Sequence, residues 1–126
     1  MSSNRHQGNS ITIYGIKNCD TMKKARAWLD NNGVAYSFHD YKSAGIERER
    51  LEQWSKKLGW EVLLNRAGTA FRQLPEKDKS GLDAKKAIAL MLAQPSMIKR
   101  PVLDLGYAKL VVGFTPALYA QSVPLR

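Results

Sequence analysis

The sequence predicts an α/β fold, because strand patterns near both ends of the chain enclose a long segment of helical patterns. A strand at 11–16, a helix at 20–31 and a second strand at 34–39 follow one another through short connections. A strand, a helix and a strand at this spacing imply a parallel pair with a right-handed crossover. Towards the C-terminus, two short apolar runs around Gly106 indicate an antiparallel hairpin.

A change in apolar periodicity predicts the first strand and the helix after it. Ile11 and Ile13 alternate with more polar residues, as in a strand that leads into a loop. Met22, Ala25 and Leu29 then recur at helical spacing. The chain therefore passes from strand to loop to helix within its first third.

The second strand is predicted directly after this helix. Asn32-Gly33 is a natural helix end, because glycine accepts the left-handed conformation that ends many helices. Val34, Tyr36 and Phe38 then alternate with other residues in the period-2 pattern of a strand with two different faces. In open parallel sheets, ligands gather at the carboxyl ends of the strands, and the loop with Cys19 lies there.

The middle of the chain carries helical patterns. A loop begins at 43–45, and Leu51, Trp54 and Leu58 then form the apolar stripe of a helix that ends near Gly59. A short apolar patch, another helical turn and a charged, exposed connector follow at 60–64, 71–74 and 75–80.

The last third of the chain is predicted to contain a helix, a hairpin and a final helix. The first helix begins after Asp83, a suitable N-cap, and ends at Gln94-Pro95. Val102–Leu105 and Leu110–Val112 form the two strands of the hairpin. Residues 115–119 form the final helix, with a threonine as N-cap and proline at the first helical position.

The bulk properties are those of one globular domain. The chain has 126 residues, of which 44% are hydrophobic. Residues 1–10 are polar and without periodicity, which is typical of a flexible leader, so the domain is expected to span 11–126. No apolar run approaches the roughly 20 residues that cross a bilayer, and the N-terminus lacks the apolar region of a signal peptide. We therefore expect a cytoplasmic location and no membrane partner.

The charge of the chain favours anionic partners. Twenty Lys and Arg residues against eleven Asp and Glu residues give a formal net charge of +9. The basic residues are scattered and no nucleic-acid-binding signature is evident, so direct binding of nucleic acid is not expected. A thiol peptide bearing carboxylates, an oxyanion and an acidic protein surface are the other candidates.

Cys19, the only cysteine, is the candidate reactive residue. A sulfur at a helix N-terminus faces unpaired backbone N–H groups and the positive end of the helix dipole, which stabilise the thiolate. Lys17, Lys23 and Lys24 add positive charge nearby. The alternative is a buried cysteine that packs as a small hydrophobic residue. Polar neighbours, among them Asn18, are more typical of a solvated loop.

The residue count excludes two kinds of site. One cysteine and two distant histidines cannot supply the three or four ligands of a zinc ion, so no metal site is expected. A C-x-x-C redox pair would need a second cysteine at position 22, where the chain has Met22. His39 has no evident route to the sulfur as a catalytic base. An isolated thiolate can still form a mixed disulfide that an external thiol such as glutathione resolves.

Several motifs resemble one known family in the same order. The segment ITIYGIKNCDTMKKARAWLDNNGV is similar to the opening of the arsenate reductase-like family, which includes ArsC, the regulator Spx and the YffB group. LLNRAGTAFRQL, MLAQPSMIKRPVLDL and VVGFTPALY resemble the YffB group at matching intervals, so the resemblance runs from about 11 to 122. It implies a thioredoxin-like fold, with a small mixed sheet flanked by helices and a helical insertion at about 44–95, between the second and third strands.

The resemblance also implies a set of residues around Cys19. Pro101 matches the proline that thioredoxin-like proteins carry in the cis form beside the reactive cysteine. Arg66 and Arg100 match two of the arginines that bind oxyanion in ArsC enzymes, and paired arginines suit carboxylates as well. The third arginine of those enzymes has no match, because this chain has Val112-Gly113-Phe114 there. With Lys17 and Asn18, which flank the cysteine, these residues are the predicted substrate-binding set.

Three functions follow from the resemblance. The first is an oxidoreductase: a glutathione-dependent monothiol reductase or thiol-transfer protein in which Cys19 is the nucleophile. It needs no bound cofactor, since glutathione or another small thiol is its co-substrate. The second is an arsenate reductase that uses glutathione and a glutaredoxin, against which the missing arginine counts. The third is a regulator that binds RNA polymerase, as Spx does, although Met22 removes the redox switch usual in Spx-like proteins.

Overall fold

The computed structural model describes residues 10–106 and 109–124. The leader predicted at 1–10 lies outside these residues except for Ser10, which is exposed. The chain divides into two compact units. The first unit comprises Met1–Asp40 with Arg100–Arg126, and the second comprises Tyr41–Lys99.

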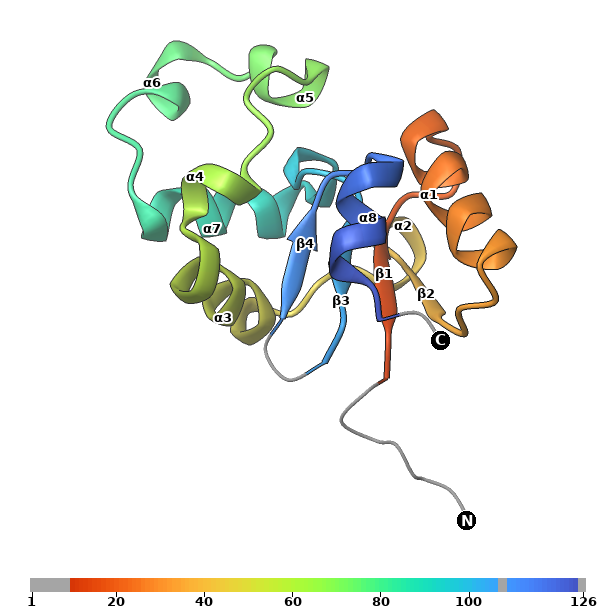
Figure 1. The fold of residues 1–126 in the computed structure, drawn as a ribbon. Helices are drawn as coiled ribbons and strands as arrows, with labels where there is room; N and C mark the ends of the chain where they lie inside the picture. The colour runs from red at the N-terminus through yellow and green to blue at the C-terminus, as the bar shows by residue number, and fades with distance from the viewer. Residues whose placement is uncertain (1–9, 107–108, 125–126) are drawn as a thin grey trace. The chain divides into compact units, whose positions relative to one another are not determined.

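The first unit contains a four-stranded sheet with the order β2-β1-β3-β4 (Figure 1). Strands β1 and β2 are parallel, with Ile13 opposite Phe38, whereas β3 is antiparallel to both β1 and β4. The predicted parallel pair, antiparallel hairpin and mixed sheet are therefore confirmed. The strands are β1 (Thr12–Gly15), β2 (Ser37–Asp40), β3 (Val102–Asp104) and β4 (Leu110–Val112).

Two helices of the first unit, α1 (Asp20–Asn31) and α8 (Pro116–Ser122), share its hydrophobic core. Ile13, Leu103 and Val111 face one another across β1, β3 and β4. This row forms one cluster with buried residues of the two helices, of the residue after α8 and of the residue after β3: Met22, Ala25, Leu29, Tyr119, Val123 and Leu105. One face of the sheet is thus covered by α1 and α8, and the order of strands brings the loop after β1 beside the start of β3.

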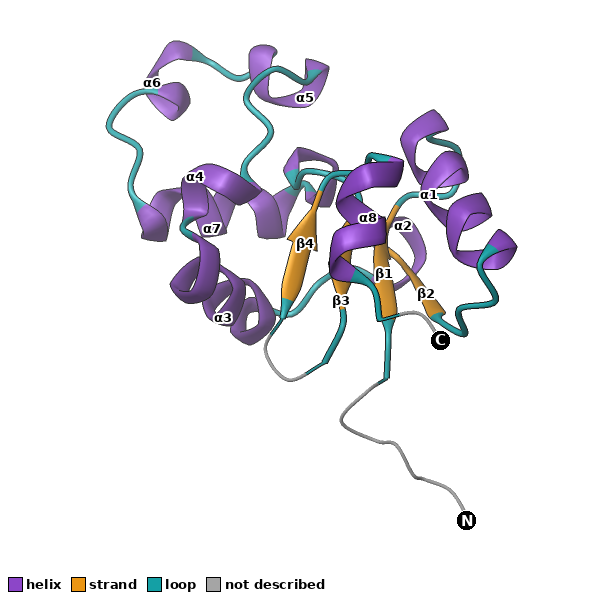
Figure 2. Cartoon of the chain, viewed as in Figure 1, coloured by secondary structure: helices purple, strands orange, loops and turns teal. Residues whose placement is uncertain are grey.

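The second unit consists of helices and loops, as Figure 2 shows for residues 41–99. It follows β2 and precedes β3, which confirms the predicted helical insertion between the second and third strands. An isolated antiparallel bridge joins Leu64, directly after the fourth helix of the chain, to Ile98, near the end of the unit. Its helices are α2 (Tyr41–Ala44), α3 (Arg48–Leu58), α4 (Trp60–Leu63), α5 (Thr69–Arg72), α6 (Glu76–Lys79), α7 (Ala84–Ala93) and the 3₁₀ helix η2 (Pro95–Met97).

The structure differs from the prediction in the short elements. Strand β2 begins at Ser37, whereas the alternation predicted a start at 34, because the N–H of Val34 donates to the carbonyl of Leu29 at the end of α1 (2.9 Å). Residues 43 and 44 of the predicted loop belong to α2, and the connector predicted at 75–80 contains α6. A single helical turn is too short to show a period of 3.6 residues, which is why the pattern missed both.

Side-chain caps begin two of the predicted helices. Asp83 accepts a hydrogen bond from the N–H of Lys86 (2.8 Å), and Thr115 accepts one from the N–H of Leu118 (3.0 Å). Each cap satisfies an N–H group that has no partner within its helix. Helix α8 continues to Ser122, three residues beyond the predicted end at 119.

The structure was also searched for membrane-spanning segments. Within residues 10–106 and 109–124, every helix is too short or too polar to cross a bilayer.

Candidate active site

Cys19 occupies the N-cap position of α1, where the chain turns from sheet to helix. Strand β1 ends at Gly15, a short loop follows, and Cys19 has extended backbone angles (φ −131°, ψ 127°). The first helical hydrogen bond runs from the N–H of Lys23 to the carbonyl of Cys19 (2.9 Å). The thiol is free and half-buried, with its inner side against the core of the first unit. Cys19 is therefore partly covered by the core and partly exposed.

The surroundings of Cys19 favour its thiolate. Burial raises the pKa of the Cys19 thiol, but the Met22 N–H, the Arg100 side chain and the Thr21 N–H together outweigh burial and lower it. The positive charge of Arg100 lowers the pKa further. The two N–H groups belong to the first turn of α1, although neither makes a cap hydrogen bond of strict geometry with the side chain. A lowered pKa increases the fraction of nucleophilic thiolate at neutral pH.

Arg100 and Pro101 lie beside the cysteine at the start of β3. The Arg100 side chain donates a hydrogen bond to the sulfur of Cys19. The peptide bond between Arg100 and Pro101 is cis, as the resemblance predicts. Pro101 is buried, and its carbonyl accepts a hydrogen bond from the N–H of Gly113 (2.8 Å), directly after β4. The structure thus brings Cys19 and Arg100 into contact.

The other predicted substrate-binding residues lie in two places. Lys17 and Asn18 are exposed in the loop before Cys19, where a ligand can reach them. Arg66 belongs to the second unit, is exposed, and stacks its guanidinium over the Trp60 ring at 5.4 Å. The binding roles of all three residues stay predictions.

His39 stacks on Tyr14, its partner in the parallel register of β1 and β2. The two ring centroids are 4.9 Å apart and the planes are tilted by 39°. This contact accounts for the position of the imidazole and points to no role in catalysis.

Aromatic residues occupy the region where ArsC enzymes were expected to carry a third arginine. Phe114 follows Gly113 and contacts Tyr119 edge-on, with ring centroids 4.7 Å apart. Tyr119 also contacts Trp28 of α1 at 5.6 Å. These rings pack against the same core as Cys19. The sequence patterns did not single out this aromatic cluster as part of the site, since Trp28 and Tyr119 show only the spacing of core residues.

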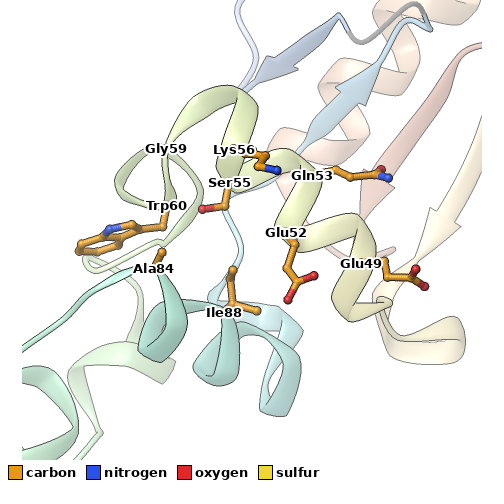
Figure 3. A pocket seen from close by; sticks show the side chains of 9 residues that line it. All are labelled: Glu49, Glu52, Gln53, Ser55, Lys56, Gly59, Trp60, Ala84 and Ile88. Carbon is orange, nitrogen blue, oxygen red and sulfur yellow. The ribbon is translucent and has the colours of Figure 1, made fainter.

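The second unit contains a cavity of about 670 Å³ between α3, the start of α4 and α7 (Figure 3). Its lining is mixed, with Trp60 and Ile88 as apolar groups and Glu49, Glu52 and Lys56 as charged groups. All the lining residues belong to the second unit, whereas Cys19 belongs to the first. Over residues 10–106 and 109–124, no group of three or more His, Cys, Asp or Glu side chains is arranged to hold a metal ion.

Arg100→Gln is expected to raise the pKa of Cys19, because it removes the charged hydrogen-bond donor beside the sulfur. A higher pKa leaves less thiolate at pH 7, so alkylation by iodoacetamide slows severalfold and its pH midpoint moves upward. For the wild-type protein we expect a midpoint below that of an ordinary cysteine, because the pKa of Cys19 is lowered. Arg100→Lys, which keeps the positive charge, is the matched control. Its alkylation midpoint is expected to lie between those of the wild-type and Arg100→Gln proteins. An unchanged midpoint in Arg100→Gln would show that Arg100 does not act on the thiol.

Comparison with known proteins identifies one family. The ArsC family model matches residues 14–122. A solved structure of a YffB protein is 60% identical, with a TM-score of 0.88, and the match covers 91% of this chain and 100% of that one. An ArsC-related protein from Brucella melitensis is 59% identical, with a TM-score of 0.73, over 92% of this chain and 96% of that one.

Curated relatives point to the same family. An uncharacterized protein from Haemophilus influenzae is 40% identical over 89% of this chain and 97% of its own length. Global transcriptional regulators named Spx also match. The Spx of Lactiplantibacillus plantarum is 24% identical over 92% of this chain and 88% of its own length.

Proposed function

Because the chain belongs to the ArsC family and its single cysteine begins α1 beside Arg100, we propose that it is a glutathione-dependent monothiol reductase or thiol-transfer protein. The observation that carries the proposal is the contact of the Arg100 side chain with the sulfur, together with two helix N–H groups that favour the thiolate. A cysteine that only fills space in the core gains nothing from groups that stabilise its thiolate, whereas a nucleophilic cysteine becomes more reactive.

The proposed reaction needs one protein thiol. The Cys19 thiolate attacks the glutathione sulfur of a glutathione mixed disulfide, so that a disulfide forms between Cys19 and glutathione and the other thiol leaves as a thiolate, which takes a proton from water. The thiolate of reduced glutathione then attacks the mixed disulfide. This second exchange releases oxidised glutathione and restores Cys19. The buried Met22, at the position of a second redox cysteine, is consistent with an external resolving thiol.

The residues around Cys19 suit an anionic thiol peptide. Glutathione carries two carboxylates. Positive charge comes from Lys17, in the loop that leads to the cysteine, and from Arg100 beside the sulfur, with Asn18 as a polar neighbour. Arg66 joins this set on the strength of the resemblance. In the proposal, the backbone before Pro101 pairs with the extended peptide, in the way an edge strand is added. A free thiol of this kind operates in a reducing compartment, for which we propose the cytoplasm.

Arsenate reduction is the second candidate, favoured by the arginine at the thiol. A thiol–arsenate adduct carries concentrated negative charge and needs several donors. In this chain, the position of the third arginine is occupied by Gly113 and the half-buried Phe114, neither of which is cationic. A regulatory role has support in the relatives named Spx. The thiol-transfer function needs neither the third arginine nor a second cysteine.

Intact-mass spectrometry tests the proposed function. The reduced protein is incubated with oxidised glutathione at pH 7, and we expect one glutathionyl group per chain that reduced glutathione removes again. Protein alkylated beforehand at its single cysteine is the control and stays unmodified. Absence of the adduct, together with a thiol of ordinary pKa, would overturn the proposal. Arsenate-dependent consumption of glutathione, or retention of RNA polymerase on the immobilised protein, would instead support one of the other two functions.

A further inference from the structure

A close contact joins the end of β1 to the first turn of α1. Gly15 is the last residue of β1, and Met22 in α1 is fully buried. A Cβ atom on Gly15 would lie 2.3 Å from the sulfur of Met22 and 2.8 Å from its terminal carbon. Both distances are far shorter than van der Waals contact. Met22 and any residue larger than glycine at position 15 therefore cannot occupy their present places together.

The need for glycine at this position is steric. Gly15 sits in a regular strand, paired with Asp40, and its φ is not in the left-handed region that favours glycine. Alanine could adopt this backbone conformation without strain. The space taken by the Met22 side chain is what excludes it.

Met22 also contributes directly to the surroundings of the sulfur. Its backbone N–H is one of the groups that favour the Cys19 thiolate, while its side chain is held between β1 and the core. Sδ and Cε are the flexible end of the Met22 side chain, which could turn aside in an open site. Met22 is fully buried, however, and in a densely packed interior the displaced end presses on its neighbours and strains its own helical turn. A shift of a few tenths of an ångström or more is enough to weaken an N–H···S interaction, which depends steeply on distance and angle.

We propose that Gly15 and Met22 are positioning residues for Cys19: the methionine side chain packs on the bare backbone of the glycine and thereby holds the first-turn N–H groups of α1 at the sulfur. The inference rests on the proposed role of Cys19 as a nucleophile. It adds the reason why residue 15 carries no side chain and why residue 22, although it has no reactive group, bears on the reactivity of the thiol.

Gly15→Ala is the direct test, read out as the pH dependence of Cys19 alkylation by iodoacetamide. The added methyl group displaces Met22, so we expect a higher midpoint and slower alkylation at pH 7. A rise of one pKa unit lowers the thiolate fraction about tenfold, but nucleophilicity rises with pKa, so the rate falls only about threefold. Leu29→Ala is the matched control. It removes a fully buried side chain from the same helix, far along from the sulfur, and leaves the midpoint unchanged.

Met22→Ala separates positioning from simple loss of packing and also covers the case in which Gly15→Ala fails to fold. It removes the side chain that anchors the turn, and we expect it to raise the midpoint. In that background, Gly15→Ala has nothing left to displace and changes the midpoint no further. A folded Gly15→Ala or Met22→Ala protein with the wild-type midpoint would overturn the inference. Failure of the wild-type protein to form a glutathione adduct would overturn the proposed function, whatever the midpoints of these variants.

Discussion

Replacing Cys19 with serine is expected to abolish both glutathione adduct formation and thiol transfer. The chain contains no second cysteine that could take over the reaction. A serine hydroxyl is far less acidic than a thiol, so it supplies no nucleophile at neutral pH. Intact-mass spectrometry after exposure to oxidised glutathione measures the adduct, and a coupled assay with a glutathione mixed disulfide measures transfer.

The controls for this variant separate chemistry from folding. Oxygen is only slightly smaller than sulfur and Cys19 is half-buried, so Cys19→Ser keeps the secondary structure, which circular dichroism checks. Lys109→Gln, an exposed change in the same unit, keeps full transfer activity. Transfer activity that persists in folded Cys19→Ser protein would refute the assignment of Cys19 as nucleophile. It would do so whatever the pKa of the thiol.

Leu103→Ala is expected to cause the largest loss of stability. Leu103 lies fully buried in the middle of β3, between Ile13 of β1 and Val111 of β4, and faces α1 and α8. Truncation removes apolar contacts and leaves a cavity that neighbouring strands cannot close, which costs about 2–5 kcal/mol of unfolding free energy. Urea denaturation, with the midpoint and slope fitted together, measures this cost.

Val62→Ala provides the comparison for an aliphatic residue that is not in the core. Val62 is 40% exposed on α4, and alanine has the higher helix propensity, so the expected change is within about 1 kcal/mol. The prediction is that Leu103→Ala loses more unfolding free energy than Val62→Ala. Equal losses in the two variants would mean that the row of Ile13, Leu103 and Val111 is not the main source of stability in the first unit.

The thiol site depends on the same core. Helix α1 is packed on the core through Met22, Ala25 and Leu29. The N–H groups of its first turn, at Thr21 and Met22, favour the Cys19 thiolate. Arg100 reaches the sulfur from the residue before Pro101, at the entry to β3. Two segments that are distant in the chain thus meet because β1 and β3 are neighbours in the sheet. Variants that disturb the pairing of β1 and β3 are therefore expected to lower the reactivity of the cysteine.

Local patterns were sufficient for the long elements. Helix α1 has the predicted bounds, Asp20–Asn31, because a run of helical spacing and a glycine after its end are both encoded within neighbouring residues. The same holds for α7, which begins after its predicted cap at Asp83. Strand β2 and the one-turn helices were less predictable, because a few residues take their conformation from the partners they meet rather than from their own periodicity.

The sequence by itself determined the most local feature of the candidate site, a lone cysteine between a strand and a helix, since that feature needs only consecutive residues. The proximity of Arg100 followed from resemblance alone, and no pattern of spacing predicted it. Only the tertiary structure decided that Met22 packs on Gly15, and that Phe114, just after β4, contacts Tyr119 of α8 edge-on. The physical reason is that hydrogen bonds and periodicity act between near neighbours in the chain. Steric fit acts between side chains that the fold alone brings together.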